Sequence, residues 1–466
     1  MANPAADKLV RWLPVGILVT GGVILLFGLH ANRHGLSERA PGADLVETTN
    51  GPAGIGKWEG KVVTGTGVAS KLAGEWPRFR GLQGNGISPE STPLLKAWPA
   101  GGPKQLWKVD VGEGFAAAAV SKGRVYVMDY DRANQSDALR CLSLDDGAEI
   151  WRYTYPSKVK RNHGMSRTIP FVADQYLIAL SPKCQVLCAD PVRGELKWKM
   201  DLVREFNVEV PPWYAGQNPF VENNRLILGT GGDALLVAVD CLTGKVLWKS
   251  PNPNKWQMTH SSIATLEFAG RKQYVYCGSG GVAGVSADDG TILWEYLDWK
   301  ISIANIATPV PVGDGRIFFC GGYNAGSAMI QLKEQAGKIT VETLFRLKPA
   351  IFGSTQQTPI LHKKHLFGVR PDGQLVCLDL NGKSVWESGP TRRFGSAPYL
   401  IAQDMIYVLD DDGTLTLVEA ALDGYKELVR AKVLEGPDAW GPIALAGGRL
   451  IVRDNNKMAC LDVGAK

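Results

Sequence analysis

Eight cysteines give this sequence its first candidates for chemistry, because cysteine forms disulfides and binds metals. Their spacing argues for packing instead. One set recurs at the same point of a repeated phrase, where another copy of the phrase has alanine: Cys141, Cys188, Cys377 and Cys460. Two more, Cys277 and Cys320, each directly precede a glycine. We therefore expect the cysteines to act as small buried apolar side chains. Only Cys184 and Cys188, close together in one hairpin, leave a disulfide open.

Two short clusters resemble parts of metal sites. His362 and His365 flank two lysines, but no carboxylate or thiol stands nearby in the sequence to complete a zinc site. Asp410 to Asp412 precede Gly413 as in the start of a calcium loop, yet the glutamate that closes such a loop is missing. Turns between strands explain both clusters, so we expect no metal site.

A third set of residues combines aromatic rings with amides, arginine and histidine. Such a mixture suits the binding of an extended peptide or a small polar ligand, or the hydrogen bonding of loops around a narrow channel; both interpretations stay open. The candidate binding residues are Arg167, Trp213, Gln217, His260, Asn305, Gln356, Arg393 and Trp440. The acids nearest to them in the sequence are Glu205, Glu209 and Asp298, a poor match for a site that needs a carboxylate to hold a metal ion and a base to act on a substrate. We therefore single out no catalytic residue.

The elements that would position these residues repeat along the chain. A short alternating strand, a glycine turn and a strand with an aromatic residue recur, most clearly as VAVDCLTGKVLWKS at residues 237–250. The anchor positions are Trp107, Trp151, Trp198, Trp248, Trp294, Phe345, Trp386 and Leu428. Repeats of about forty to fifty residues built from short strands are typical of propeller blades. We predict an all-β, eight-bladed β-propeller with four-stranded antiparallel blades.

The two ends of the repeat array complete each other. The segment QLWKVDV at residues 105–111 is an outer strand with no blade before it, and KMACLDV at residues 457–463 is a third strand with no outer strand after it. Their pairing would close the ring and remove its free edges. The propeller should then span residues 103–466, preceded by a lead-in at residues 76–102 and a flexible, glycine-rich linker at residues 31–75.

One uncharged apolar run, from Leu13 to Leu29, lies near the N-terminus. Its length is close to the lower limit of a membrane-spanning helix. A cleaved signal peptide is the alternative, but Leu29-His30-Ala31 places a large residue where cleavage requires a small one. We expect residues 1–30 to be a signal anchor, with the propeller on the extracytoplasmic (periplasmic) side. The net charge of +5 includes no basic run interleaved with aromatics, so no nucleic-acid binding is expected.

The phrase from Asp240 to Trp248, DCLTGKVLW, resembles the quinoprotein (pyrroloquinoline-quinone-type) propeller repeat, and similar copies cover about four-fifths of the chain. The resemblance implies that the blade tryptophans pack between neighbouring blades. These are Trp107, Trp151, Trp198, Trp248, Trp294 and Trp386. The segment WPRFRG, which starts at Trp76, also looks like the lead-in of such proteins. We expect it to pack across one face of the ring.

The resemblance implies one of two functional branches: quinone-dependent dehydrogenases, or non-catalytic propellers that include a subunit assisting outer-membrane barrel assembly. The enzymes resembling this chain place two adjacent cysteines beneath the quinone, and this sequence has no such pair. It also lacks the Cys-x-x-Cys-His signature of covalent haem. We therefore expect a membrane-anchored scaffold without a cofactor that binds a protein partner, whose identity the sequence does not give. The alternatives are a quinone- and calcium-dependent oxidoreductase with an atypical site, or a hydrolase or carbohydrate binder.

Overall fold

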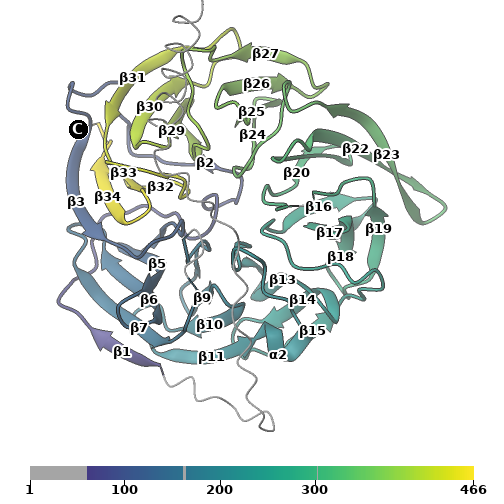
Figure 1. Ribbon diagram of the computed structural model, residues 1–466, viewed down its shortest axis with the longest axis horizontal. Helices are drawn as coiled ribbons and strands as arrows, with labels where there is room; N and C mark the ends of the chain where they lie inside the picture. Colours follow the sequence, from purple (N-terminus) through teal and green to yellow (C-terminus); the bar gives the residue numbers. More distant parts are fainter. Residues whose placement is uncertain (1–59, 161–163, 302, 466) are drawn as a thin grey trace, which may run out of the picture. The chain divides into compact units, whose positions relative to one another are not determined.

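Short strands rich in β-branched and aromatic residues form eight separate sheets, and each sheet contains four antiparallel blade strands. The computed structural model describes residues 60–160, 164–301 and 303–465, which belong to one unit. The sheets are arranged as blades around a centre, with the earliest strand of most blades innermost (Figure 1). The prediction of an eight-bladed propeller with four-stranded antiparallel blades is confirmed.

Seven blades are continuous in sequence. Their strands are β4–β7 (Ala119–Ser121, Arg124–Asp131, Ser136–Ser143, Glu149–Pro156), β8–β11 (Phe171–Val172, Leu177–Leu180, Gln185–Ala189, Leu196–Asp201), β12–β15 (Phe220–Glu222, Arg225–Gly231, Ala234–Asp240, Val246–Lys249), β16–β19 (Ala264–Phe268, Arg271–Gly278, Gly281–Ser286, Ile292–Tyr296), β20–β23 (Val310–Gly313, Arg316–Gly321, Gly326–Gln335, Lys338–Leu347), β24–β27 (Ile360–His362, His365–Val369, Leu375–Asp379, Ser384–Glu387) and β28–β31 (Tyr399–Ala402, Met405–Leu409, Thr414–Glu419, Glu427–Lys432). The β22–β23 hairpin is longer than its counterparts and extends outward from the ring (Figure 1).

The eighth blade joins the two ends of the array. It contains β32 (Ala444–Ala446), β33 (Arg449–Arg453) and β34 (Lys457–Asp462), and its outer strand is β3 (Lys104–Asp110). β3 pairs antiparallel with β34, so that Trp107 lies opposite Cys460. The predicted closure is confirmed, and it fastens the ring without an additional covalent link.

One short strand extends a blade at its outer edge. β1 (Lys61–Thr64) pairs antiparallel with β7 at the outer edge of its blade. The amides of Gly65 and Gly67 continue this contact by donating to the carbonyls of Ile150 and Glu149, each at 2.9 Å. Residues 60–75 therefore differ from the flexible linker expected over residues 31–75, because backbone hydrogen bonds hold them along the blade. Four paired residues are too short a strand to show in the sequence pattern.

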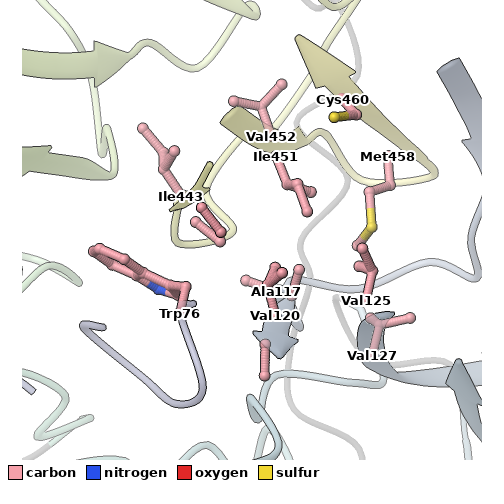
Figure 2. Close-up of a cluster of buried hydrophobic side chains, with 14 of the residues drawn as sticks. Trp76, Ala117, Val120, Val125, Val127, Ile443, Ile451, Val452, Met458 and Cys460 are labelled. Carbon is pink, nitrogen blue, oxygen red and sulfur yellow. The ribbon is translucent and has the colours of Figure 1, made fainter. Parts of the chain in front are cut away.

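The lead-in segment runs across the ring from blade to blade: Arg78 donates to the Val221 carbonyl of β12, and Arg80 donates to the carbonyls of Thr358 and Pro359, which precede β24. The Trp76 amide and carbonyl both bond to Val120 at 2.8 Å, and the Val172 amide donates to Pro77. β2 (Ile87–Ser88) then pairs parallel with β28. Trp76 is buried in one apolar cluster with Val120 and Ile443 (Figure 2). This segment thus ties together blades that lie far apart in the sequence.

The predicted anchor from Leu13 to Leu29 and residues 31–59 of the predicted linker lie outside the described residues. The helix α2 (Leu202–Phe206) is capped by the Asp201 carboxylate, which accepts from the amides of Val203 and Arg204. Within the described ranges, no helix has the length and apolar character that a membrane crossing requires.

All eight cysteines lie within the described residues, and each is buried with a free thiol. Cys141, Cys188 and Cys377 lie opposite the tryptophan of their own blade, as Cys460 does across the closing pair. The pair left open by the sequence forms no disulfide. Cys184 packs 3.7 Å from the Met258 sulfur, whereas Cys188 faces the Cys241 carbonyl. The cysteines fill space in the core, as predicted.

Candidate functional site

The six blade tryptophans form a ring of contacts between blades, which we call the tryptophan ring: Trp107, Trp151, Trp198, Trp248, Trp294 and Trp386. Trp198 shows the full contact, which Trp107 shares, whereas the indole nitrogens of Trp151 and Trp248 have no hydrogen-bond partner within the described residues. Its indole nitrogen donates to the Cys241 carbonyl of the next blade at 2.8 Å, and its ring covers Gly244, whose φ is +73°. A Cβ on Gly244 would lie 2.9 Å from that ring. The turn glycine of the repeat therefore makes room for the neighbouring tryptophan.

Trp294 departs from this geometry. Its indole nitrogen bonds to Gln273 of its own blade at 2.6 Å. The next blade carries the long β22–β23 hairpin, and Gly337 at the end of that hairpin has nothing within 4 Å of an added Cβ. Trp294 therefore satisfies its buried nitrogen within its own blade.

The segments that lead into the innermost strands converge on a cavity of ≈130 Å³, which we call the channel-mouth pocket. Most blades contribute to it, together with Phe79 of the lead-in and the turn between β21 and β22. Its lining residues are Phe79, Phe115, Arg167, Trp213, Gly216, Asn218, His260, Ser262, Ala304, Ile306, Tyr323, Gln356, Gln357, Trp440 and Pro442.

Five of the eight predicted binding residues line this pocket: Arg167, Trp213, His260, Gln356 and Trp440. The other three lie outside its lining. The Gln217 amide joins two blades by bonding to the Gly229 amide and the Ser261 carbonyl. The Asn305 carbonyl accepts from the His260 amide at 3.0 Å. Arg393 is exposed and donates to the carbonyls of Pro390 and Asp372.

Arg167 supplies the positive charge of the pocket. Its guanidinium stacks over the Phe115 ring at 5.1 Å. It donates from Nε to the Trp213 carbonyl at 2.6 Å and from Nη2 to the Gly164 carbonyl at 3.2 Å. Burial lowers its pKa to about 10, which still leaves the group charged at neutral pH.

His260 is held as a neutral side chain. Its Nε2 lies 2.9 Å from the Tyr214 carbonyl, so the ring donates there and its Nδ1 is an acceptor. Burial, and next the charge of Arg167, lower its pKa to about 4. The pocket therefore contains one fixed cation and a neutral imidazole near pH 7.

The sequence interpretation missed three aromatic walls of the pocket. Phe115 stacks on Trp440, with ring centroids 5.2 Å apart and an interplanar angle of 25°. Phe115 lies four residues before the inner strand β4, so comparison with the equivalent segments of the other blades could have found it. Tyr323 lies in the glycine-rich turn between β21 and β22, and Phe79 lies in the lead-in. Neither position belongs to the segments that the repeat pattern singled out.

The lining residues do not fit a quinone held by calcium. None of them carries a carboxylate or a thiol, whereas calcium requires several oxygen ligands, usually including carboxylates. The acids Glu205, Glu209 and Asp298 are absent from the lining. Across residues 60–465, apart from 161–163 and 302, no group of three or more His, Cys, Asp or Glu could hold a metal.

The two clusters that resemble metal sites have structural roles. His362 pairs with Asp404 at 2.8 Å. The aspartates beside Gly413 bind backbone and hydroxyl groups: Asp410 and Asp412 both accept from the Thr414 amide. Burial, and next the hydrogen bond with Asp412, raise the pKa of Asp410 to about 7. These carboxylates stabilise a hairpin turn.

Comparison with known proteins places this architecture in a family. The PQQ_2 family model, described as "Outer membrane protein assembly factor BamB", matches residues 135–388 and 345–427. No curated protein matches the chain. Among solved structures, a europium-containing methanol dehydrogenase is 12% identical, with 81% of this chain and 89% of that chain covered and a TM-score of 0.57.

Two further solved structures are similar over about three-quarters of the length of this chain. BamB from Moraxella catarrhalis is 14% identical, with 77% of this chain and 99% of that chain covered and a TM-score of 0.49. The computationally designed protein Ika8 is 11% identical, with 77% and 100% covered and a TM-score of 0.50. At such identities solved structures inform on the fold alone. The family model spans more than half of the sequence, and the chain therefore belongs to the PQQ-type propeller family that this model, described as outer membrane protein assembly factor BamB, represents.

Proposed function

We propose that this protein is a membrane-anchored, extracytoplasmic scaffold whose propeller binds a protein partner at the channel-mouth pocket. The observation that carries the proposal is the collection of five aromatic side chains and Arg167 in one recess. Aromatic residues and arginine are the types that dominate the energetics of protein interfaces. Tyr323, at 42% exposure, belongs to the lining, and Ile303, at 51% exposure, adjoins the lining residue Ala304 in sequence.

The family and the N-terminal sequence support the two remaining parts of the proposal. The matching family model is described as an outer membrane assembly factor, which favours a binding role over catalysis. The apolar run from Leu13 to Leu29 favours attachment to a membrane with the propeller exported. The lining residues supply no carboxylate for acid–base chemistry or for a metal.

Site-specific photo-crosslinking in the native membrane tests the binding face. A photoreactive phenylalanine analogue in place of Tyr323 should give a specific adduct with a protein partner. The same analogue in place of Val385, which is exposed on the outer strand β27, is the matched control. Equal adducts at both positions, or none at position 323, would overturn the proposed face.

Two measurements test the other parts. Alkaline carbonate should leave the full chain in the membrane fraction and release a variant that lacks residues 13–29. Protease added to intact cells should digest the propeller only after the outer membrane has been permeabilised. Addition of pyrroloquinoline quinone and calcium should produce no bound chromophore and no alcohol-dependent dye reduction. A clear redox signal would replace the scaffold with the oxidoreductase alternative.

A further inference from the structure

The size of the channel-mouth pocket matches a single aromatic ring. Its volume is ≈130 Å³, and a cavity of about 150 Å³ lined by apolar side chains holds one benzene molecule. The stacked pair Phe115 and Trp440 forms part of the wall, with Trp213, Tyr323 and Phe79 completing the aromatic lining. Aromatic walls favour a flat apolar guest through offset and edge contacts.

The electrostatic character of the pocket favours an anionic group on that guest. Arg167 is charged and contributes to the lining, and no aspartate or glutamate lines the same cavity. Its contacts with the carbonyls of Trp213 and Gly164 fix the guanidinium in place. A cation held within low-dielectric walls attracts an anion over several ångströms without direct hydrogen bonding.

Polar groups in the lining remain available for the oxygens of such an anion. In the described ranges, neither the Gln356 amide nor the Tyr323 hydroxyl has a hydrogen-bond partner. Both are donors, and a carboxylate offers only acceptors. The Gln357 amide nitrogen, by contrast, is occupied by the carbonyls of Ser396 and Trp440. Gln356 and Tyr323 are thus the donors that a ligand can recruit.

We propose that the channel-mouth pocket binds one aromatic ring that carries a carboxylate, with the ring between the aromatic walls and the carboxylate directed toward Arg167, Gln356 and Tyr323. The acid is either a free small molecule or the C-terminal aromatic residue of a polypeptide. Only the second source rests on the proposed scaffold function. The ligand chemistry is the same in both.

Calorimetric titration of the full chain in detergent tests the ligand class. The probes are 3-phenylpropionate, its uncharged amide, and a short peptide ending in phenylalanine with a free or an amidated C-terminus. The acid should bind saturably, and the amide at least about tenfold more weakly, which equals about 1.4 kcal/mol. Equal affinities for acid and amide, or no saturation of the acid up to about 10 mM, would overturn the proposal.

Arg167→Gln should remove the difference between acid and amide. Arg393→Gln is the matched control, because Arg393 is exposed, bonds to loop carbonyls and does not line the pocket. Tyr323→Phe keeps the aromatic wall and removes the hydroxyl, so it should weaken the acid alone by about threefold to tenfold. The Tyr323→Phe variant keeps the test decisive if Arg167→Gln does not fold. Retention of acid preference in both variants would refute the assigned roles.

The peptide arm separates this inference from the scaffold. Binding of 3-phenylpropionate without binding of the free-acid peptide would support the ligand class and exclude the polypeptide source. Binding of the free-acid peptide, weakened by amidation and by Arg167→Gln, would support that source. Cross-linking at Tyr323 is independent of either titration, so failure of the scaffold and failure of the ligand class give different results.

Discussion

The tryptophan ring and the channel-mouth pocket use aromatic residues in opposite ways. In the ring, successive blades place the same residue type in the same contact, as Trp107 and Trp386 do with a carbonyl of the following blade, each at 2.9 Å. In the pocket, neighbouring blades contribute different side chains. Arg167, Trp213 and His260, for example, come from the equivalent segments that precede the innermost strands of their blades. The first pattern follows the repeat, and the second departs from it.

The difference reflects the two demands on a closed repeat. Neighbouring blades meet at similar angles around the ring, so one residue type solves the packing problem repeatedly. The channel mouth has no such repeated contact, because its side chains point toward a shared centre. Positions that break the repeat without improving blade packing are therefore the candidates for binding. Substitutions in the two regions test this division between packing and binding.

The largest expected effect belongs to the tryptophan ring. Trp151 is 2% exposed and covers Gly194 of the next blade. Trp151→Ala should lower the free energy of unfolding by about 3–5 kcal/mol, since a large buried ring leaves a cavity. Trp213→Ala in the pocket should cost only about 1 kcal/mol, because Trp213 is partly exposed. Denaturant titration measures both, and similar losses would contradict the division.

This division also explains what the sequence predicted. The repeated phrase of a glycine turn followed by an aromatic strand predicted the blades, their number and the closure between residues 105–111 and 457–463, because each copy reports the same local packing. The pocket was predicted only in part. Arg167 and His260 lie in segments that can be aligned between blades, whereas Tyr323 reaches the pocket from a turn and Phe79 from outside the repeats. Residues that only the tertiary fold brings together leave no periodic pattern in the sequence.

A buried carboxyl gives the second prediction. Asp137, in β6, is fully buried beside Tyr155 and Ser157, where the neighbouring strand β7 ends. Burial raises its pKa to about 7, while hydrogen bonds to Ser157 and Tyr155 and the charge of Lys183 oppose the shift. Between pH 4 and pH 7 the unfolded chain releases this proton and the folded chain keeps it, so stability falls as pH rises.

Asp137→Asn should remove that dependence. The wild-type protein should lose up to about 4 kcal/mol of unfolding free energy from this group between about pH 4 and pH 7, and the variant should not. Asp174→Asn is the control, because the Asp174 side chain is 76% exposed and pairs with Lys122 at the surface. Parallel pH profiles for the wild type and Asp137→Asn would show that Asp137 is ionised in the folded state.

A glycine pair separates backbone strain from the tryptophan contact. Gly194 has a φ of +74°, and an added Cβ would lie 2.5 Å from Trp151; Gly270 has a φ of +68° and nothing within 4 Å. At both positions, alanine in the left-handed backbone conformation should lower the free energy of unfolding by the same amount, about 1 kcal/mol. Gly194→Ala should lose a further 1–2 kcal/mol, roughly, from the displaced indole. If denaturant titration gives equal losses, the tryptophan ring tolerates displacement and contributes less than its burial implies.

The smallest expected effect is the absence of a pH response at the pocket. The pKa of His260 is about 4, because burial and the nearby charge of Arg167 disfavour its protonation. An ordinary histidine titrates near pH 6.5. The affinity for 3-phenylpropionate should therefore stay constant between about pH 5.5 and pH 8, since the histidine stays neutral and the ligand stays ionised. Calorimetry at several pH values measures this. A severalfold gain in affinity on acidification that disappears in His260→Asn would show that the imidazole gains a proton on binding. The pocket would then contain two cations, and its preference for an anion would depend on pH in a way that no contact of the tryptophan ring does.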